Sequence, residues 1–142
     1  MQYVCDASPK LTWFRIDSEA EAARESAEMN HRVEKHFRQT WEDAARSYAP
    51  PSTARYIEQD IGKKDHIIRT MPIFLTLRDE DGKALVTAML PPGDTRSNAF
   101  RAVVVGRANS DPWPEYGEAI AKLAAHYGIV LEQAHCYPYR RA

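Results

Sequence analysis

The sequence predicts a single α+β domain, in which a long N-terminal helix and a shorter C-terminal helix pack on a mostly antiparallel sheet of about four to five strands. Three observations predict this fold class. Residues 17–49 contain neither glycine nor proline and carry a helical apolar stripe. Two apolar runs flank the turn-forming pair Asp81-Gly82, and a second amphipathic segment ends at Gly128. The 142 residues are the size of one ordinary domain.

The first predicted elements are a strand and the long helix. The run from Leu11 to Ile16 is rich in aromatic and β-branched residues, which favour a strand. Asp17 or Ser18 is a suitable N-cap, and the acidic residues that follow suit the positive end of a helix. Two prolines, at positions 50 and 51, end the helix after Ala49.

The long helix has one broad apolar face when its residues are placed at 100° steps. Asn30 lies about 40° from the centre of this face, so we expect it to be partly buried at the rim. The residues of the apolar face are Ala22, Ser26, Met29, Val33, Phe37, Trp41, Ala44 and Tyr48.

Glu28 and His31 have the Glu-x-x-His spacing of a metal-binding pair on a helix. On a straight helix both point about 140–160° away from the centre of the apolar face, toward solvent. His36 lies about 140° around the axis from His31, so the two histidines cannot share a metal. A di-metal bundle needs a second Glu-x-x-His motif, and the sequence contains none. We interpret this stretch as a solvated helix surface and predict no metal site.

The second half of the chain predicts three strands and a helix. Residues 52–70 are ambiguous between strand and helix, and Asp65–Thr70 favours a short helix. Ile73 to Gly106 then predicts a three-stranded antiparallel meander, with its third strand at residues 99–107. The apolar stripe of residues 114–127 predicts a helix with Gly128 at its C′ position. We expect the tail from residue 129 to begin as a strand and to end in an aromatic and basic segment.

Composition narrows the function classes. Nineteen basic and twenty acidic residues give a net charge of −1, so bulk charge gives no support to nucleic-acid binding. Cys5 and Cys136 are too few for a disulfide scaffold and lack zinc-site spacing. The first residues do not resemble a signal peptide, and no apolar run is long enough to span a membrane. We expect a cytoplasmic protein that contacts no membrane.

The length of the predicted helix suggests assembly. From Ser18 to Tyr48 an unbroken helix would be about 46 Å long, whereas a compact domain of this size is about 37 Å across. Without glycine or proline inside it, a break is the less favoured alternative. We therefore predict a homodimer whose interface includes Phe37, Trp41 and Tyr48. In the competing interpretation, the sheet and residues 57–68 cover the whole stripe within one monomer.

An anionic small molecule is the predicted ligand, if the chain binds one. The arginines Arg96, Arg101 and Arg107 lie in and around the third strand of the meander, and His135 and Cys136 form the densest cluster of functional groups near the C-terminus. Each group also has an interpretation without a ligand. Arg96 would belong to a polar connecting loop and Arg101 would be a charge on an edge strand. His135 and Cys136 would belong to a C-terminal segment packed on the domain. We expect no cofactor.

These observations leave two function classes. We favour a non-catalytic, oligomeric binding or assembly module, because the sequence contains none of the common motifs of hydrolases, zinc proteases or dinucleotide-binding enzymes. The alternative is a small enzyme or ligand-binding protein for an anionic small molecule. The enzyme or ligand-binding alternative requires the arginines and the C-terminal cluster to converge on one pocket, whereas the assembly module does not.

Overall fold

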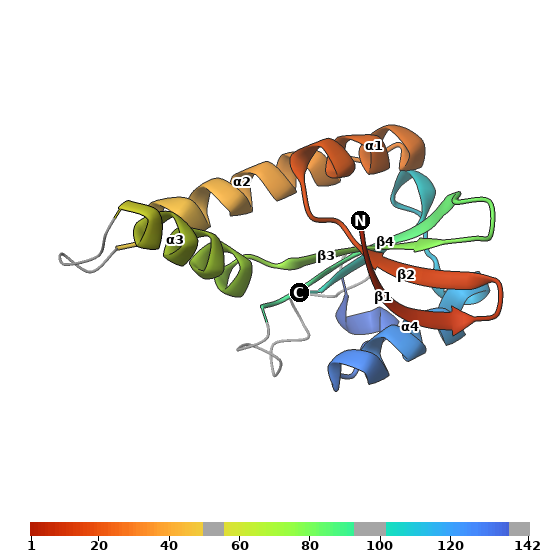
Figure 1. Cartoon of the computed structure of the whole chain (residues 1–142). Helices are drawn as coiled ribbons and strands as arrows, with labels where there is room; N and C mark the ends of the chain where they lie inside the picture. Colours follow the sequence, from red (N-terminus) through yellow and green to blue (C-terminus); the bar gives the residue numbers. More distant parts are fainter. Residues whose placement is uncertain (50–55, 93–101, 137–142) are drawn as a thin grey trace.

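The computed structural model, which describes residues 1–49, 56–92 and 102–136, places helices on both faces of a five-stranded sheet (Figure 1). The strands lie side by side in chain order, and every neighbouring pair is antiparallel. The α+β fold class is therefore confirmed. The elements are β1 (Gln2–Ser8), β2 (Leu11–Arg15), α1 (Glu19–Met29), α2 (Val33–Arg46), α3 (Tyr56–Thr70), β3 (Ile73–Arg78), β4 (Ala84–Leu90), β5 (Val103–Val105), the 3₁₀ turn η3 (Arg107–Asn109), α4 (Trp113–Tyr127) and the 3₁₀ turn η4 (Gln133–His135).

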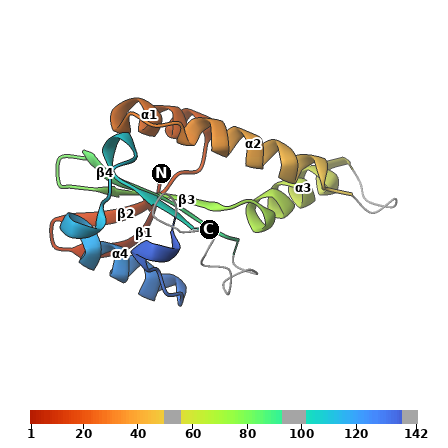
Figure 2. The ribbon, with the colours of Figure 1, turned by 180° about the vertical axis from the view of Figure 1, so that it is seen from behind.

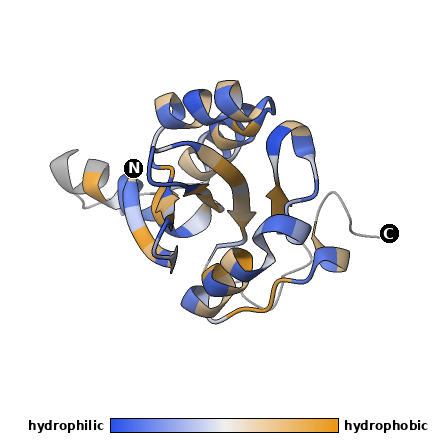
Figure 3. Cartoon of the chain, turned by 90° about the vertical axis from the view of Figure 1, so that its right-hand side faces the viewer, coloured by the Kyte–Doolittle hydropathy of each residue, from blue (hydrophilic) through white to orange (hydrophobic). Residues whose placement is uncertain are grey.

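Alternating side chains of the strands supply two separate cores, one on each face of the sheet. On the face covered by α4, Leu75 and Leu77 pack with Leu123, and the Trp13 indole N–H donates to the carbonyl of Ala119 at 2.9 Å. On the other face, Phe74 belongs to the core under α1 and α2. Figure 3 shows the apolar strands between helices whose outer surfaces are largely hydrophilic.

Several turns form where local residues predict them. Gly82 has φ +80° in the β3–β4 hairpin, and Gly128 has φ +66° at the end of α4. Ser18 caps α1, because its hydroxyl accepts from the Glu21 amide at 3.2 Å. The predicted three-strand meander is formed by β3, β4 and β5. The last strand, β5, covers residues 103–105 of the predicted 99–107. Residues 99–101 of that prediction lie outside the described part of the chain.

The predicted unbroken helix is wrong, because two helices, α1 and α2, meet at a corner formed by residues 30–32. Asn30 ends α1 in the left-handed conformation, with φ 53° and ψ 55°, and its N–H donates to the Ser26 carbonyl. Asparagine tolerates this conformation better than other residues with a Cβ. The prediction that Asn30 is partly buried is also wrong, since its side chain is exposed.

Other elements also differ from the predictions. β1 was not predicted, and α3 is one helix across residues 56–70, a stretch that the sequence left ambiguous between strand and helix. Residues 129–136 form no strand, only the short turn η4. No helix in the described parts of the chain is both long and apolar enough to cross a membrane.

The α2–α3 pair projects beyond the sheet, as the views in Figures 1 and 2 both show. Phe37 is nevertheless covered within the chain, and its ring meets that of Phe74 edge to face at 5.1 Å. Tyr48 is half-buried, with its ring 5.5 Å from His66. Trp41 remains 44% exposed. The homodimer prediction rested on a single helix longer than the domain, and that single helix does not form. The homodimer itself stays a prediction.

Candidate functional site

The corner between α1 and α2 turns His31 and Arg32 toward the sheet. Ser26 holds the corner, because its hydroxyl accepts from the backbone N–H of Glu34 at 2.9 Å and so caps α2 from the preceding helix. His31 reaches β4, where its Nε2 lies 2.8 Å from the Thr87 hydroxyl. The sequence-based prediction that His31 lies on the solvent side is therefore wrong, because the break at Asn30 changes the helical phase.

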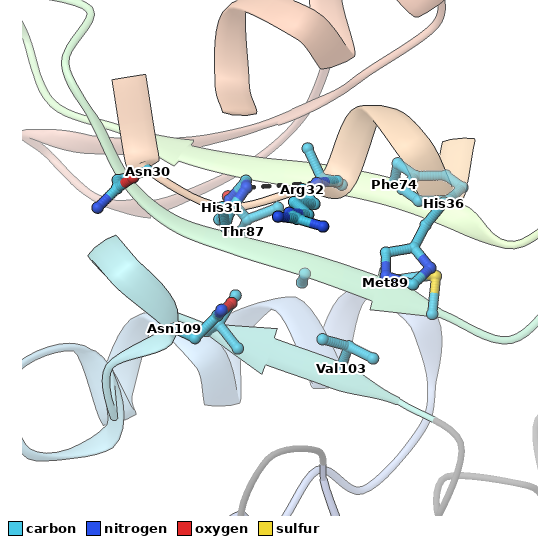
Figure 4. Close-up of a pocket in the computed structure, with 12 residues that line it drawn as sticks. Asn30, His31, Arg32, His36, Phe74, Thr87, Met89, Val103 and Asn109 are labelled. Atoms are coloured by element: carbon cyan, nitrogen blue, oxygen red, sulfur yellow. Dashed lines mark hydrogen bonds between the residues drawn. The ribbon is translucent and has the colours of Figure 1, made fainter. Parts of the chain in front are cut away.

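A cleft of about 690 Å³ lies below this corner. Figure 4 shows its walls: the corner residues stand on one side, β5 and η3 on the other, and β4 runs between them. Because α1 and α2 leave part of the β4–β5 face uncovered, apolar strand residues line the cleft together with polar ones. The lining residues are Asn30, His31, Arg32, Val33, His36, Phe74, Thr87, Ala88, Met89, Val103, Val105 and Asn109.

A buried ion pair lies beside the cleft, under α1. Glu25 is fully buried although it carries a carboxylate, since it occupies the sheet-facing side of α1 with Ala22 and Met29. Its Oε1 accepts from the Arg78 guanidinium at 2.8 Å, and Arg78 also donates to the Gly82 carbonyl at 2.9 Å. The pair links α1 to the β3–β4 hairpin.

A chain of hydrogen bonds connects this ion pair to the cleft. The Thr87 hydroxyl donates to Glu25 Oε2 at 2.5 Å, so its oxygen must accept the bond from His31. With Glu25 ionised, His31 carries its proton on Nε2. In agreement, Nδ1 faces the backbone N–H of Val33 at 3.4 Å and can accept from it. Both ring nitrogens of a neutral His31 are thus occupied.

Burial shifts the pKa of both ionisable ends of this chain toward the neutral form. Desolvation raises the pKa of Glu25, and the hydrogen bond from Thr87 and the charge of Arg78 oppose that rise. Desolvation also lowers the pKa of His31, and the nearby His36 acts in the same direction. The geometry and the pKa of His31 both favour a neutral imidazole that holds its position.

Arg32 gives the cleft its charge. Within the described residues its guanidinium has no hydrogen-bond or ion-pair partner. None of the twelve described lining residues is acidic. Arg32 also precedes α2, whose N-terminal end carries a partial positive charge. The lining therefore favours a negatively charged group over a positive one.

The structure separates the ligand residues predicted from the sequence. Arg96 and Arg101 lie outside the described residues. Arg107 lines a second, smaller cavity of about 390 Å³, where the acidic side chains of Glu28, Asp111 and Glu115 also lie. His135 pairs with Glu132, its Nδ1 lying 3.4 Å from the carboxylate. Of the predicted residues, Arg107, His135 and Cys136 do not line the larger cleft.

Cys136 is a core residue. It is fully buried among the apolar side chains under α4, and burial raises its pKa to about 11. A thiol with this pKa is almost wholly protonated at neutral pH and is a poor nucleophile. Among the described residues, no three His, Cys, Asp or Glu side chains gather closely enough to hold a metal ion.

The most informative site residues, Asn30, His31, Arg32 and Glu25, were not predicted as a site. Two sequence signals point to them in retrospect. Asn30 is the residue type that most readily ends a helix in the left-handed conformation when glycine is absent. Glu25 lies three residues after Ala22 and four before Met29, so it interrupts the apolar face of the helix.

Comparisons with known proteins give no further assignment. No protein-family model matches the chain. Searches of curated proteins and of solved structures also give no match. The candidate site therefore stands on its own residues and geometry.

Proposed function

We propose that this protein binds a small anionic molecule in the cleft between the α1–α2 corner and β5, and that it does so without catalysing a reaction. The observation that carries the proposal is the Arg32 guanidinium, which has no partner in the described chain and lies over a cleft whose described lining has no carboxylate. The cavity volume of about 690 Å³ is within the range of small-molecule sites.

The hydrogen bonds of His31 support a structural role for this side chain rather than a role as general base. A general base needs a free ring nitrogen within reach of the substrate. In His31, Nε2 donates to Thr87 and Nδ1 faces the Val33 amide. We infer that His31 fixes the corner, so that Arg32 is held at the cleft.

Thermal unfolding in the presence of anions tests this proposal. A ligand that binds only the folded state raises Tm by an amount that grows with its concentration. We expect at least one of inorganic phosphate, citrate and octanoate to raise the Tm of the wild type and of Lys35→Gln, but not of Arg32→Gln. Lys35 is a matched control, because it is exposed on α2 and does not line the cleft.

This pair of variants also separates binding from general salt effects. Anions that stabilise by exclusion from the surface raise the Tm of all three proteins equally. Equal shifts in the wild type, Lys35→Gln and Arg32→Gln would contradict the proposed site, as would the absence of any shift.

Self-association is the second candidate function, favoured by the apolar side chains exposed on the projecting helices. Trp41 on α2 is 44% exposed, and Ile61 and Ile68, seven residues apart on α3, are 58% and 57% exposed. We propose that this region forms a homodimer interface. Light scattering coupled to size-exclusion chromatography should find a dimer for the wild type and a folded monomer for Trp41→Glu. A monomeric wild type would contradict it.

The cytoplasmic location stays a prediction.

A further inference from the structure

The cleft has two chemically different ends, which the register of β4 and β5 defines. Thr87 pairs with Val105 at one end, and Met89 pairs with Val103 at the other. The two rungs are about 7 Å apart along the strands. Figure 4 shows His31 and Asn109 near the Thr87 rung, with Asn30 beyond His31, and Phe74 and His36 near Met89. A ligand lying along the strands would therefore contact mainly polar side chains at the Thr87 end, and apolar side chains together with the exposed ring of His36 at the Met89 end.

The polar end of the cleft suits an anionic group with only two oxygen acceptors, such as a carboxylate. Arg32 is the one described lining residue that is always charged, and its planar guanidinium can donate two parallel hydrogen bonds to a carboxylate. The side chains of Asn30 and Asn109 are exposed at the same end and can donate from their amides. The Arg32 guanidinium alone can satisfy both oxygens of a carboxylate.

A phosphate group would find fewer partners than it needs. Phosphate sites commonly use several backbone N–H groups at a helix N-terminus. At the start of α2 these groups are already engaged: the Glu34 amide donates to Ser26, and the Val33 amide faces His31. The corner that positions Arg32 thus uses the donors that a phosphate would require.

The apolar end suits a hydrocarbon body. Phe74 is buried there, and Met89 and Val103 are partly buried, so their apolar surfaces border the cavity. Burying a ligand's apolar atoms against these side chains favours binding in proportion to the area removed from water. Together with Arg32, this end favours an amphipathic ligand over a purely polar anion.

We propose that the cleft binds a monocarboxylate with an apolar body, an aromatic ring or a medium-length alkyl chain, with the carboxylate on Arg32 and the body against Met89 and Val103. This ligand class rests on the proposed function, since it specifies the anion that the same site takes.

Calorimetric titration of the full chain with three probes tests the ligand class. Octanoate has both a carboxylate and an apolar body, 1-octanol has only the body, and inorganic phosphate has only the charge. We expect octanoate to bind at least about tenfold more tightly than either of the others. Arg32→Gln should weaken octanoate binding about tenfold, whereas Lys35→Gln should leave it unchanged.

A second variant pair tests the apolar end. Val103→Thr keeps the side-chain shape but replaces a methyl group with a hydroxyl in the cleft, and we expect it to weaken octanoate binding several-fold. Val130→Thr is the control, because Val130 is exposed and does not line the cleft. Circular dichroism of each variant establishes that it is folded.

The outcomes distinguish the two proposals. Phosphate binding that depends on Arg32 and matches or exceeds octanoate binding would overturn the ligand class but support anion binding. Equal binding of 1-octanol and octanoate, or octanoate binding insensitive to Arg32 and Val103, would overturn the ligand class as well. If none of the three probes binds, the ligand class fails, and the proposed function fails with it if citrate also leaves the Tm of the wild type unchanged.

Discussion

Removing the buried carboxylate of Glu25 should destabilise the fold, because it leaves Arg78 without its main partner. In Glu25→Met, the guanidinium loses a bond of 2.8 Å in a side chain that is only 13% exposed, and Thr87 loses its acceptor. Breaking a buried ion pair in this way costs about 3–5 kcal/mol. Arg78 keeps the Gly82 carbonyl at 2.9 Å and Glu28 at 3.8 Å. We therefore expect about 3 kcal/mol, at the lower end of this range.

Removing both charges should restore most of the loss. In Glu25→Met/Arg78→Met, no uncompensated charge remains under α1, so the double variant should unfold within about 1 kcal/mol of the wild type. Arg78→Met alone should be costly too, since it leaves Glu25 fully buried with its carboxylate unpaired by charge. The two single losses should therefore not add.

Urea denaturation at pH 7 measures all four proteins in one double-mutant cycle. We expect a coupling energy of about 2 kcal/mol or more between the two positions. Additive losses in the double variant would refute the reasoning, because they would mean that Glu25 and Arg78 stabilise the fold independently.

The pKa of Glu25 is raised in the folded state, so its contribution to stability is most favourable below about pH 4.5 and is lost as pH rises through the folded pKa. Over that window, urea denaturation should show the free energy of unfolding of the wild type falling with pH relative to that of Glu25→Gln. A difference that stays constant with pH would contradict this prediction. Nitrogen-15 NMR should find His31 as the Nε2–H tautomer with a pKa below 6.5, so its contribution is lost as pH falls below 6.5. An Nδ1–H tautomer would contradict the hydrogen-bond chain. Asn30→Ala should lose about 1 kcal/mol in urea denaturation and Asn30→Gly much less, because φ is 53° there. Equal losses would show that the backbone conformation is not the cause. Cys136 should react with iodoacetamide at pH 8 far more slowly than Cys5, which is only partly buried, and mass spectrometry that finds equal rates would contradict its burial.

Elements that depend on neighbouring residues could be predicted from the sequence. The β3–β4 hairpin turns at Gly82 and α4 ends at Gly128, since both positions need a backbone conformation that glycine adopts without strain. The N-cap at Ser18 depends on a hydrogen bond only three residues along the chain. Local chemistry is sufficient to predict each of these features.

The candidate site could not be predicted, because it depends on contacts far apart in the sequence. His31 contacts Thr87, 56 residues away, and Glu25 contacts Arg78 and Thr87, 53 and 62 residues away. The 100° helical projection also assumed one continuous helix, so it placed His31 toward solvent. The break at Asn30 is stabilised by the cap from Ser26 to Glu34, which forms only after the corner has turned.

Chemical-shift mapping is the most direct test of the claim that the cleft at the α1–α2 corner is a binding site for anions. Octanoate is titrated into nitrogen-15-labelled wild type and Arg32→Gln, and the backbone amides are followed. We predict saturable shifts at residues 30–33, 87–89 and 103–105 in the wild type, and their loss in Arg32→Gln. Shifts confined to other parts of the chain, or identical shifts in the two proteins, would contradict the account.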